Sequence, residues 1–557
     1  MGIFTSYGFA MGDLVFKLFN GYTTNAMPTQ EETLLNIMER NKDTELGKKF
    51  GFADIKSIKD FQDKVPMSTF EDYLPLIERT LNGEENVITG DRILRYCESS
   101  GSAGKPKIQP KTTRDVWNMY CLGFVGTLGC VGAYFREHGV KHMPTQKGPL
   151  LMSLNGHRLK NGLMSNGAGQ LPFQYIKPIL PFFITTPKDI LFPEDEPNTD
   201  ILYFQLRTAL ADRKITYLGS MVITLLTQMF EYLEENWEML VHDIETGTVD
   251  KRVKCPESLR KKYGNMKPNP KRAAELRKIF ENGFDKEPVA LKIWPKLLYG
   301  YGMTGSTLMV YAEKLKRYIG DLPMHNMGYA ASEGFMAMCV DMNSQDYVLL
   351  PRSLIYEFIP VDEPDIERPL TLDKLEVGKD YEIIITNFSG LYRYRILDIV
   401  RCTGEYNNSK KIQFLYRSNM GLNVANEKTT TDMLDIAAQM VEEHFGIKLE
   451  SYSYYGNTED REARYMLLAE SKDITKDMLP EIENYLEEAM TQLNSKYGKY
   501  RSWGMIGMPE VKKLRDGAYA RYKASLVSQG RIINQIKPVT VINTPEKKEF
   551  FFGEIEE

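Results

Sequence analysis

The stretch SSGSAGKPK, from Ser99 to Lys107, is the most informative part of this chain of 557 residues. Gly101 and Gly104 can adopt backbone conformations with φ > 0, which lets successive backbone amides turn toward one anion. The serines of the stretch add hydroxyl donors, and Lys107 adds a positive charge. We therefore predict a loop that binds the phosphates of ATP.

The sequence around this loop differs from a Walker A loop. The pattern GxxxxGK[ST] needs glycine at position 99 and a hydroxyl residue after Lys105, whereas the chain has Ser99 and Pro106. A P-loop NTPase is therefore not expected. Val87 to Tyr96 can form a strand and the residues after Thr112 look helical, which predicts the order strand, loop, helix. A flexible surface loop would explain the small residues but not the Pro-Lys pair that ends the stretch.

The composition is that of a soluble globular protein. Hydrophobic residues make up 42% and charged residues 26%, and the formal net charge is −5. These values do not favour nucleic acid or an anionic membrane as a partner. A single core rarely grows beyond roughly 250–300 residues, so we predict a large domain and a smaller one. The six cysteines form no CxxC pair and the six histidines no HExxH motif, which predicts neither disulfides nor a zinc site.

We expect the protein in the cytoplasm and not in a membrane. The N-terminus lacks the basic segment and the cleavage site of a signal peptide. The apolar run from Leu122 to Phe135 has glycine at every third position from 123 to 132, and it is too short to span a bilayer. The run instead predicts a buried helix that packs closely against its neighbours.

Secondary-structure patterns divide the chain into two parts. Residues 20–85 and Ile215 to Glu245 show helical patterns, whereas Tyr347 to Phe414 consists of short β-type runs. A polar stretch follows Arg417, and a tail of mixed helices and strands follows that stretch. We therefore predict one domain over residues 1–418 and a second, mobile domain over residues 419–557.

Two further clusters accompany the loop: YAASEG at Tyr329 to Gly334 and YRYRILD at Tyr392 to Asp398. In this order the three resemble the phosphate-loop, Tyr-x-x-Ser/Thr-Glu and Arg-x-x-Gly-Asp motifs of the adenylate-forming superfamily. That superfamily includes acyl-CoA synthetases, luciferases and the adenylation domains of peptide synthetases.

Within this superfamily the chain is identified as a member of the Gretchen Hagen auxin-responsive family of acyl acid amido synthetases. The likeness covers nearly the whole chain and includes WPKL at Trp294 to Leu297, GDLP at Gly320 to Pro323 and the terminal SQGRIINQIKP. It implies an α/β fold with a large N-terminal adenylate-forming domain, in which helices flank β-sheets and one part is β-barrel-like. A small mobile α+β C-terminal domain would carry Lys428 and Lys537 to the nucleotide.

The resemblance implies ATP and Mg²⁺ as cofactors and a reaction in two steps. ATP would adenylate a small hydrophobic carboxylic acid and release pyrophosphate, and an amino acid or another amine would then displace AMP. Glu333 would bind Mg²⁺, and Ser332 would assist at the phosphates. Tyr329 would lie against the adenine, and Asp398 would accept hydrogen bonds from the ribose. We name no catalytic base, because a deprotonated amine is itself nucleophilic, and we expect a monomer.

The expected site residues fall into two groups. Those with a catalytic role are Lys107, Glu333, Lys428 and Lys537, and Glu333 is also the expected metal ligand. Those that bind the nucleotide are Ser99, Ser100, Gly101, Ser102, Gly104, Lys107, Thr304, Gly305, Ser306, Tyr329, Ala330, Ser332, Asp398 and Arg417. We expect the acyl pocket among three apolar segments: Trp117 to Tyr134, Pro178 to Phe183, and the start of the helix at Met221.

Two positions depart from the family pattern. Ala103 stands where Thr, Ser or Glu is usual, which removes one hydroxyl donor from the loop. Leu397 replaces the glycine that normally precedes the aspartate, so we expect the backbone there to avoid φ > 0 and the ribose contact to be weakened. These departures leave a non-catalytic nucleotide-binding protein as one alternative. An acyl-CoA ligase, which would pass the adenylate to a thiol, is the other.

Overall fold

The chain forms two compact units, each with its own core. Among the described residues, the first unit comprises the chain up to Ile396 together with Val400–Phe414, and the second comprises Leu397–Ile399 and the chain from Leu415 onward. The domain boundary at residue 418 stays a prediction. The mobility of the second part stays a prediction. The computed structural model describes all residues except 1, 99–107, 142, 144, 153, 155, 167–176, 194–198, 285, 304–308, 418–421, 423, 425–428, 459–462, 503–505, 530–535, 537 and 557.

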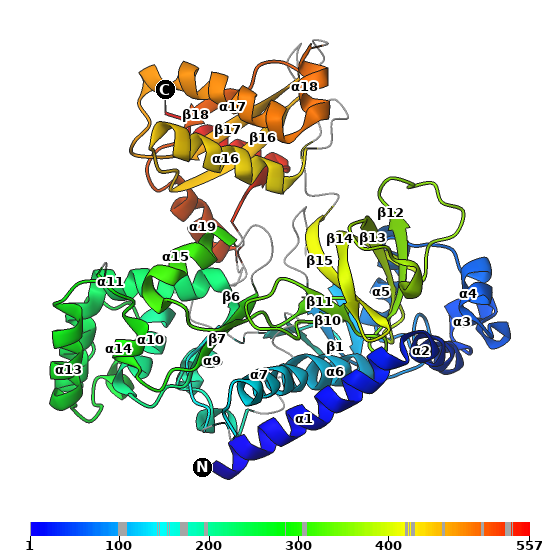
Figure 1. Ribbon diagram of the computed structural model, residues 1–557, viewed down its shortest axis with the longest axis horizontal. Coiled ribbons are helices and arrows are strands. Elements are labelled where there is room, and N and C mark those ends of the chain that lie inside the picture. The colour runs from blue at the N-terminus through cyan, green and yellow to red at the C-terminus, as the bar shows by residue number, and fades with distance from the viewer. Residues whose placement is uncertain are drawn as a thin grey trace. The chain divides into compact units, whose positions relative to one another are not determined.

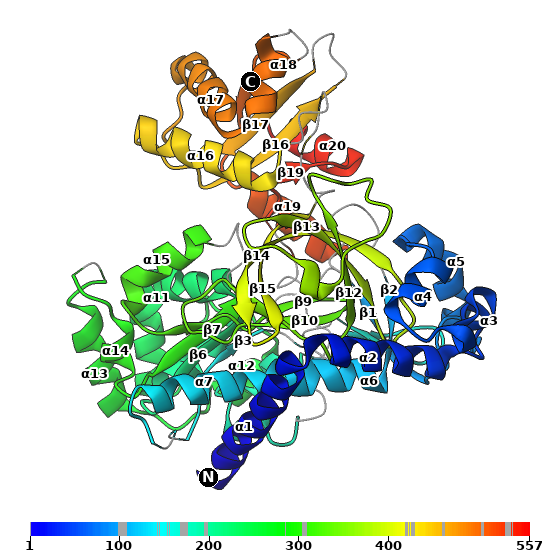
Figure 2. The ribbon, with the colours of Figure 1, turned by 45° about the vertical axis from the view of Figure 1, so that its right-hand side comes forward.

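The first unit begins with helices, as the pattern of residues 20–85 predicts. These are α1 (Gly2–Thr24), α2 (Ala26–Asn41), α3 (Glu45–Phe50), α4 (Ile58–Lys64) and α5 (Phe70–Leu81). Helix α1 lies alongside α7 (Gly126–Glu137), as Figures 1 and 2 show. A Cβ atom on Gly129 would lie 2.3 Å from the carbonyl oxygen of Gly12, so a side chain at Gly129 would force the helices apart. The predicted close packing of this apolar run is confirmed.

One helical stretch of the described chain, Thr113–Glu137, is long and apolar enough to cross a membrane. Within it, 72% of the most apolar window is buried inside the protein. This agrees with the prediction of a buried helix.

A parallel sheet with helices on both faces forms part of the first unit. Its strand order is β3 (Leu150–Leu151), β6 (Tyr217–Val222), β7 (Tyr299–Met303) and β8 (Met324–His325). Tyr217 and Tyr299 pack with residues of α7, whereas Leu218 belongs to a cluster of helices on the opposite face. Such double coverage is usual for parallel sheets. The helices of this part that Figure 1 labels are α10 (Ile201–Ala211), α11 (Ile223–Thr246), α13 (Pro270–Phe280), α14 (Ala290–Ile293) and α15 (Met309–Ile319), and Figure 2 also labels α12 (Glu257–Tyr263).

A sheet of seven strands forms another part of the first unit, in the order β12-β13-β14-β15-β11-β10-β9. Its strands β12 (Ile355–Pro360) and β13 (Asp380–Thr386) pair antiparallel and are buried along almost their whole length. The other strands are β9 (Tyr329–Ala331), β10 (Gly334–Met338), β11 (Tyr347–Leu349), β14 (Tyr394–Tyr406) and β15 (Ser409–Arg417). The predicted β-rich segment from Tyr347 to Phe414 is confirmed, and so is the α/β class.

Two sequence-based expectations need correction. The predicted loop is followed by a strand, β2 (Ile108–Thr112), which pairs antiparallel with β1 (Ile93–Glu98) before α6 (Thr113–Asn118) begins. The structure therefore has one more strand, between the predicted loop and the helix, than the sequence predicts. The segment from Ile215 also starts with strand β6 and becomes helical only at Ile223. In both cases the segment is too short for its period to distinguish a strand from a helix.

The second unit contains a four-stranded sheet with the order β18-β17-β16-β19, and helices cover it. Tyr465, Leu467 and Ala469 of β17 pack with α16 and α17, whereas Met466 and Leu468 pack with α19 and α20. Alternating side chains thus bury both faces, as expected for a small α+β domain. The strands are β16 (Ser451–Asn457), β17 (Arg464–Glu470), β18 (Glu510–Lys513) and β19 (Val541–Ile542), and the helices are α16 (Thr431–Phe445), α17 (Leu479–Leu493), α18 (Ser495–Ser502), α19 (Ala518–Ser528) and α20 (Pro545–Gly553).

Candidate active site

Many of the predicted site residues lie outside the described part of the chain. They are Ser99, Ser100, Gly101, Ser102, Gly104, Lys107, Thr304, Gly305, Ser306, Lys428 and Lys537. The structure does place the other predicted residues, which lie in two groups. Tyr329, Ala330, Ser332 and Glu333 belong to the first unit, and Asp398 and Arg417 to the second.

Glu333 lies in a tight hairpin. Strands β9 and β10 pair with Ala331 opposite Gly334, so Ser332 and Glu333 form the two-residue connection. Such connections favour turns with positive φ and residues such as Asn and Gly. Neither Ser332 nor Glu333 is among the described residues with positive φ. Contacts from other elements therefore have to hold this turn.

The carboxylate of Glu333 is buried and receives only neutral donors. The residue is 5% exposed, so it is not an ordinary surface charge. The side-chain amide of Gln109 donates to Oε1 at 2.8 Å, and the hydroxyl of Ser332 donates to Oε2 at 3.0 Å. Among the described residues, no salt bridge to Glu333 is found. Within the part of the chain that the structure describes, this buried carboxylate thus has no cation beside it.

The peptide of Glu333 is anchored by buried polar residues of β2 and of the segment after β13. Lys111 Nζ and Asn387 Nδ2 donate to the carbonyl oxygen of Glu333 at 3.1 and 2.9 Å. Lys111 also lies 3.6 Å from a carboxylate oxygen of Asp115, which accepts a hydrogen bond from Ser389. Burial raises the pKa of Asp115 above its ordinary value, although the Lys111 ammonium opposes that shift.

Tyr329 and Ala330 lie on β9, next to this turn. The ring of Tyr329 is mostly buried and packs 6.3 Å from the ring of Tyr347 and 5.8 Å from that of Phe414, measured between centroids. Ala330 is exposed. The residue predicted for the adenine is thus a core aromatic, and its neighbour, predicted for the nucleotide, is a small residue at the surface.

Asp398 is paired with Arg417 in the second unit. The guanidinium Nε of Arg417 lies 2.5 Å from Oδ1 of Asp398, which is almost fully buried. The expectation for the preceding residue is wrong, because Leu397 has φ +66°, in the left-handed region. Leucine thus occupies the conformation that glycine would adopt more easily, and this costs roughly 1–2 kcal/mol.

The sequence analysis missed Gln109, Lys111 and Asn387. A signal for the first two exists in KIQPKT, because residues two apart in a strand share one face. Reading residues 108–112 as a strand would have placed both polar side chains together beside the loop. Asn387 gives no such signal, since it reaches Glu333 only through the pairing of distant strands.

The three segments predicted for the acyl pocket meet in one apolar cluster. Phe124, Phe183 and Met221 each pack against a buried core that contains Leu180. Met221 lies at the end of β6 instead of at the start of a helix. The ring of Phe124 stacks on Tyr120 at 6.4 Å, in a seven-residue π-helix, Met119–Val125. Such π-helical turns occur often at functional sites.

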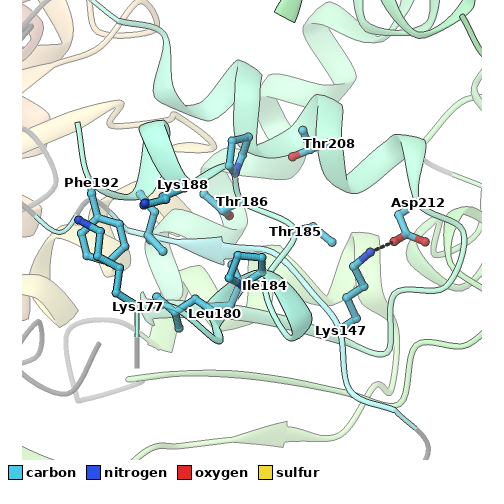
Figure 3. Close-up of a pocket in the computed structure, with 13 residues that line it drawn as sticks. Lys147, Lys177, Leu180, Ile184, Thr185, Thr186, Lys188, Phe192, Thr208 and Asp212 are labelled. Atoms are coloured by element: carbon cyan, nitrogen blue, oxygen red, sulfur yellow. Dashed lines mark hydrogen bonds and ion pairs between the residues drawn. The ribbon is translucent and has the colours of Figure 1, made fainter. Parts of the chain in front are cut away.

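A cavity of about 300 Å³ lies beside the same cluster (Figure 3). Leu180, Ile184 and Leu191 belong both to the cluster and to the cavity lining. Figure 3 shows the ion pair of Lys147 and Asp212 at one end of the cavity, with a nitrogen-to-oxygen distance of 2.6 Å. None of the described residues predicted for the nucleotide lines it.

Three family models match the chain in order. They are described as the GH3 family N-terminal domain over residues 15–324, the GH3 family central domain over residues 347–417 and the GH3 family C-terminal domain over residues 431–546. The first alone spans more than half of the chain. The border between the last two falls in the polar stretch after Arg417.

Relatives and solved structures match over nearly the full length. A jasmonoyl-L-amino acid synthetase, GH3.5 of Oryza sativa subsp. japonica, is 27% identical and aligns over 95% of this chain and 94% of its own. An indole-3-acetic acid-amido synthetase, GH3.3 of Arabidopsis thaliana, is 28% identical over 94% and 91%. The structure of the AtGH3.15 acyl acid amido synthetase in complex with 2,4-DB covers 98% of this chain and 96% of its own, with a TM-score of 0.82 and 24% identity. This last likeness establishes the fold.

Proposed function

This chain belongs to the GH3 family, and we propose that it is an acyl acid amido synthetase that works through an acyl-adenylate. It uses ATP to join a small hydrophobic carboxylic acid to an amino acid or another amine. The names of the relatives in rice and Arabidopsis support this proposal. The structural observation that carries it is the Glu333 carboxylate, which is buried, is fixed by neutral donors and pairs with no cation of the described chain.

The chemistry requires an activated acid. A carboxylate does not react with an amine in water, because the leaving group would be oxide or hydroxide. In the first step a carboxylate oxygen attacks the α-phosphorus of ATP, and the bond to pyrophosphate breaks. In the second step the amine nitrogen attacks the acyl carbon, AMP leaves with the electron pair of the broken bond, and the amine loses a proton.

Glu333 is the proposed ligand of Mg²⁺. Proteins usually hold this ion with one or two carboxylates together with phosphate oxygens and water. The carboxylate fits, because each of its oxygens accepts one hydrogen bond from a neutral group and keeps a further lone pair. When bound, Mg²⁺ supplies charge neutralisation at the phosphates. Among the described residues, no group of three His, Cys, Asp or Glu offers a different metal site.

The remaining roles rest on the family motifs. The loop from Ser99 to Lys107 and the lysines at 428 and 537 are proposed to bind phosphate oxygens, since flexible cations and backbone amides suit that charge. Asp398, held by Arg417, is proposed to accept hydrogen bonds from the ribose. The C-terminal part is proposed to move during the reaction, and a cytoplasmic monomer remains our prediction.

The acid is proposed to be apolar, and aromatic acids suit the site best. Phe124 and Tyr120 offer stacked rings, and Phe183 and Met221 pack against the same apolar core. Ring faces bind flat apolar groups by offset stacking. Phe124→Ala should therefore raise the KM for aromatic acids. Phe192→Ala is the matched control. Phe192 packs against the same cluster, but it lines the cavity of Figure 3, so this variant should change the KM little.

The decisive experiment supplies purified protein with ATP, Mg²⁺ and a panel of carboxylic acids, with either amino acids or CoA. We expect acid-dependent release of pyrophosphate and an amide product that appears only with amino acids. A thioester without any amide would identify an acyl-CoA ligase instead. Nucleotide binding without pyrophosphate release would identify a non-catalytic protein.

A further inference from the structure

The described residues that hold the turn of Glu333 carry no net charge among themselves, apart from Glu333. Among the described residues, Lys111 is the cation that contacts this turn, and it donates to the carbonyl oxygen of Glu333 and lies beside Asp115 instead of pairing with the Glu333 carboxylate. Asn387, Ser332 and Gln109 are neutral. The net charge of this buried group is therefore the single negative charge of Glu333.

Gln109 makes the closest contact with that charge. Its side chain, on β2, is 1% exposed and donates to Oε1 of Glu333 at 2.8 Å. The oxygen of the same amide, Oε1 of Gln109, is buried and has no hydrogen-bond partner within the part of the chain that the structure describes. A buried acceptor without a partner costs about 1–3 kcal/mol. The amide is thus oriented for the carboxylate and not for its own best solvation.

A lysine or arginine at position 109 would stabilise the buried carboxylate more strongly than an amide does, because it would form an ion pair. It would also neutralise the charge that a divalent cation needs. A neutral donor fixes the position of the carboxylate and leaves its charge available. Outer residues of this kind commonly change metal affinity by about 10–100-fold when mutated.

We propose that Gln109 is a positioning residue for the metal site, which fixes the Glu333 carboxylate through a neutral hydrogen bond so that its charge serves a divalent cation. This inference rests on the proposed function. Lys111 and Asn387 fix the peptide of the same turn, and Gln109 fixes the side chain.

Two substitutions separate this role from simple packing. Gln109→Met keeps the volume and removes the donor. Gln109→Lys supplies an ammonium that can pair with Glu333 and stabilise the fold. The chain offers a matched control in Gln62, whose amide donates to Oε1 of Glu357 at 2.9 Å in the same unit. Glu357 already pairs with Arg393, so Gln62→Met removes an equivalent hydrogen bond away from the proposed site.

The probe is Mn²⁺, followed by electron paramagnetic resonance in the presence of the full-length protein and α,β-methylene-ATP. Thermal unfolding is measured on the same samples. We expect Gln109→Met to weaken Mn²⁺ binding to the complex about tenfold and Gln109→Lys to weaken it about a hundredfold. The Tm of Gln109→Lys should equal or exceed that of the unmutated protein. Gln62→Met should lower the Tm and leave Mn²⁺ binding within about twofold.

Three outcomes would count against these ideas in different ways. Unchanged Mn²⁺ binding in both Gln109 variants, with a lower Tm, would overturn the role of Gln109 and leave the proposed function intact. Equal weakening of Mn²⁺ binding by Gln62→Met would also overturn it, because the effect would not be local. If the unmutated protein binds no Mn²⁺ with the nucleotide analogue, the proposed function itself fails.

Discussion

Two buried glutamates of the first unit both accept a hydrogen bond from a glutamine, but they differ in whether an arginine lies beside them. Glu357 on β12 and Glu333 in the β9–β10 turn are 1% and 5% exposed, and each accepts a hydrogen bond from a glutamine amide. Glu357 meets an arginine, through contacts of 2.9 to 3.2 Å with Arg393. Glu357 is thus neutralised, whereas no residue of the described chain forms an ion pair with Glu333.

The arginine shows what a structural carboxylate looks like in this protein. Arg393 also donates to the carbonyl oxygens of Gln62 and Val65, so it connects the end of α4 to the seven-stranded sheet. Its φ of +47° is costly for arginine, and these buried contacts hold it there. Glu333 has donors that orient it, and none of the residues that the structure describes plays the part of Arg393 there. The difference between the two sites separates a residue that stabilises the fold from one that is kept available for a ligand.

The largest effect is expected when the structural pair is broken. Arg393→Met leaves the Glu357 carboxylate buried without a cation, which should destabilise the first unit by about 3–5 kcal/mol. The midpoint of urea unfolding measures this loss. The double variant Arg393→Met with Glu357→Leu should recover most of it, because no buried charge remains. If the single variant unfolds at the same urea concentration as the unmutated protein, the structural role of the pair is wrong.

The opposite result is expected at the other glutamate. Glu333→Gln removes an uncompensated buried charge, so the urea midpoint should stay the same or rise. Acid-dependent pyrophosphate release should fall at least about a hundredfold, or about 2.7 kcal/mol in activation free energy. A loss of stability with unchanged activity would reverse the comparison between the two glutamates.

A third carboxylate, in the second unit, tests how the pKa and the stability depend on pH when the hydrogen-bond donor is neutral. Asp435 of α16 accepts a hydrogen bond from the Tyr452 hydroxyl at 3.0 Å, and burial raises its pKa to about 7. Because the folded state then holds its proton more tightly than the unfolded state, stability is highest below about pH 4 for this group. Stability should decrease as the pH rises from about 4 to 7, by up to about 4 kcal/mol.

Asp435→Asn keeps an acceptor for Tyr452 and removes the titration. The variant should therefore lack this decrease, and it should exceed the unmutated protein in stability above pH 7. Urea unfolding of both proteins across this pH range, followed by a probe in the second unit, makes the measurement. Parallel pH profiles for the two proteins would show that Asp435 is not the responsible group.

The smallest effect is expected beside Asp398, which resembles Glu357 in having an arginine partner. At Leu397, glycine should be more stable than alanine by about 1 kcal/mol, because φ is positive there. Alanine is the more stable residue at ordinary positions, so the order itself diagnoses the strain. Urea midpoints of Leu397→Gly and Leu397→Ala give the comparison, and alanine as the more stable variant would refute it.

Much of the architecture could be predicted from the sequence. The β-rich segment from Tyr347 to Phe414 and the close-packed glycine helix follow from local patterns, since period and residue size act over a few residues. Strand β2 and strand β6 at the start of the Ile215 segment are not recognised in this way. Short segments fit more than one period, and pairing with other strands decides between them.

The sequence by itself determined the family, the order of the motifs and the identity of Glu333 as the carboxylate of interest. Only the tertiary structure decided that this carboxylate is buried, that Gln109 holds it and that no described cation neutralises it. It also decided that Leu397 adopts the backbone conformation that its own side chain disfavours. The physical reason is the same in each case. Burial and charge compensation depend on residues that are hundreds of positions apart in the chain, and local sequence carries no record of which of them meet.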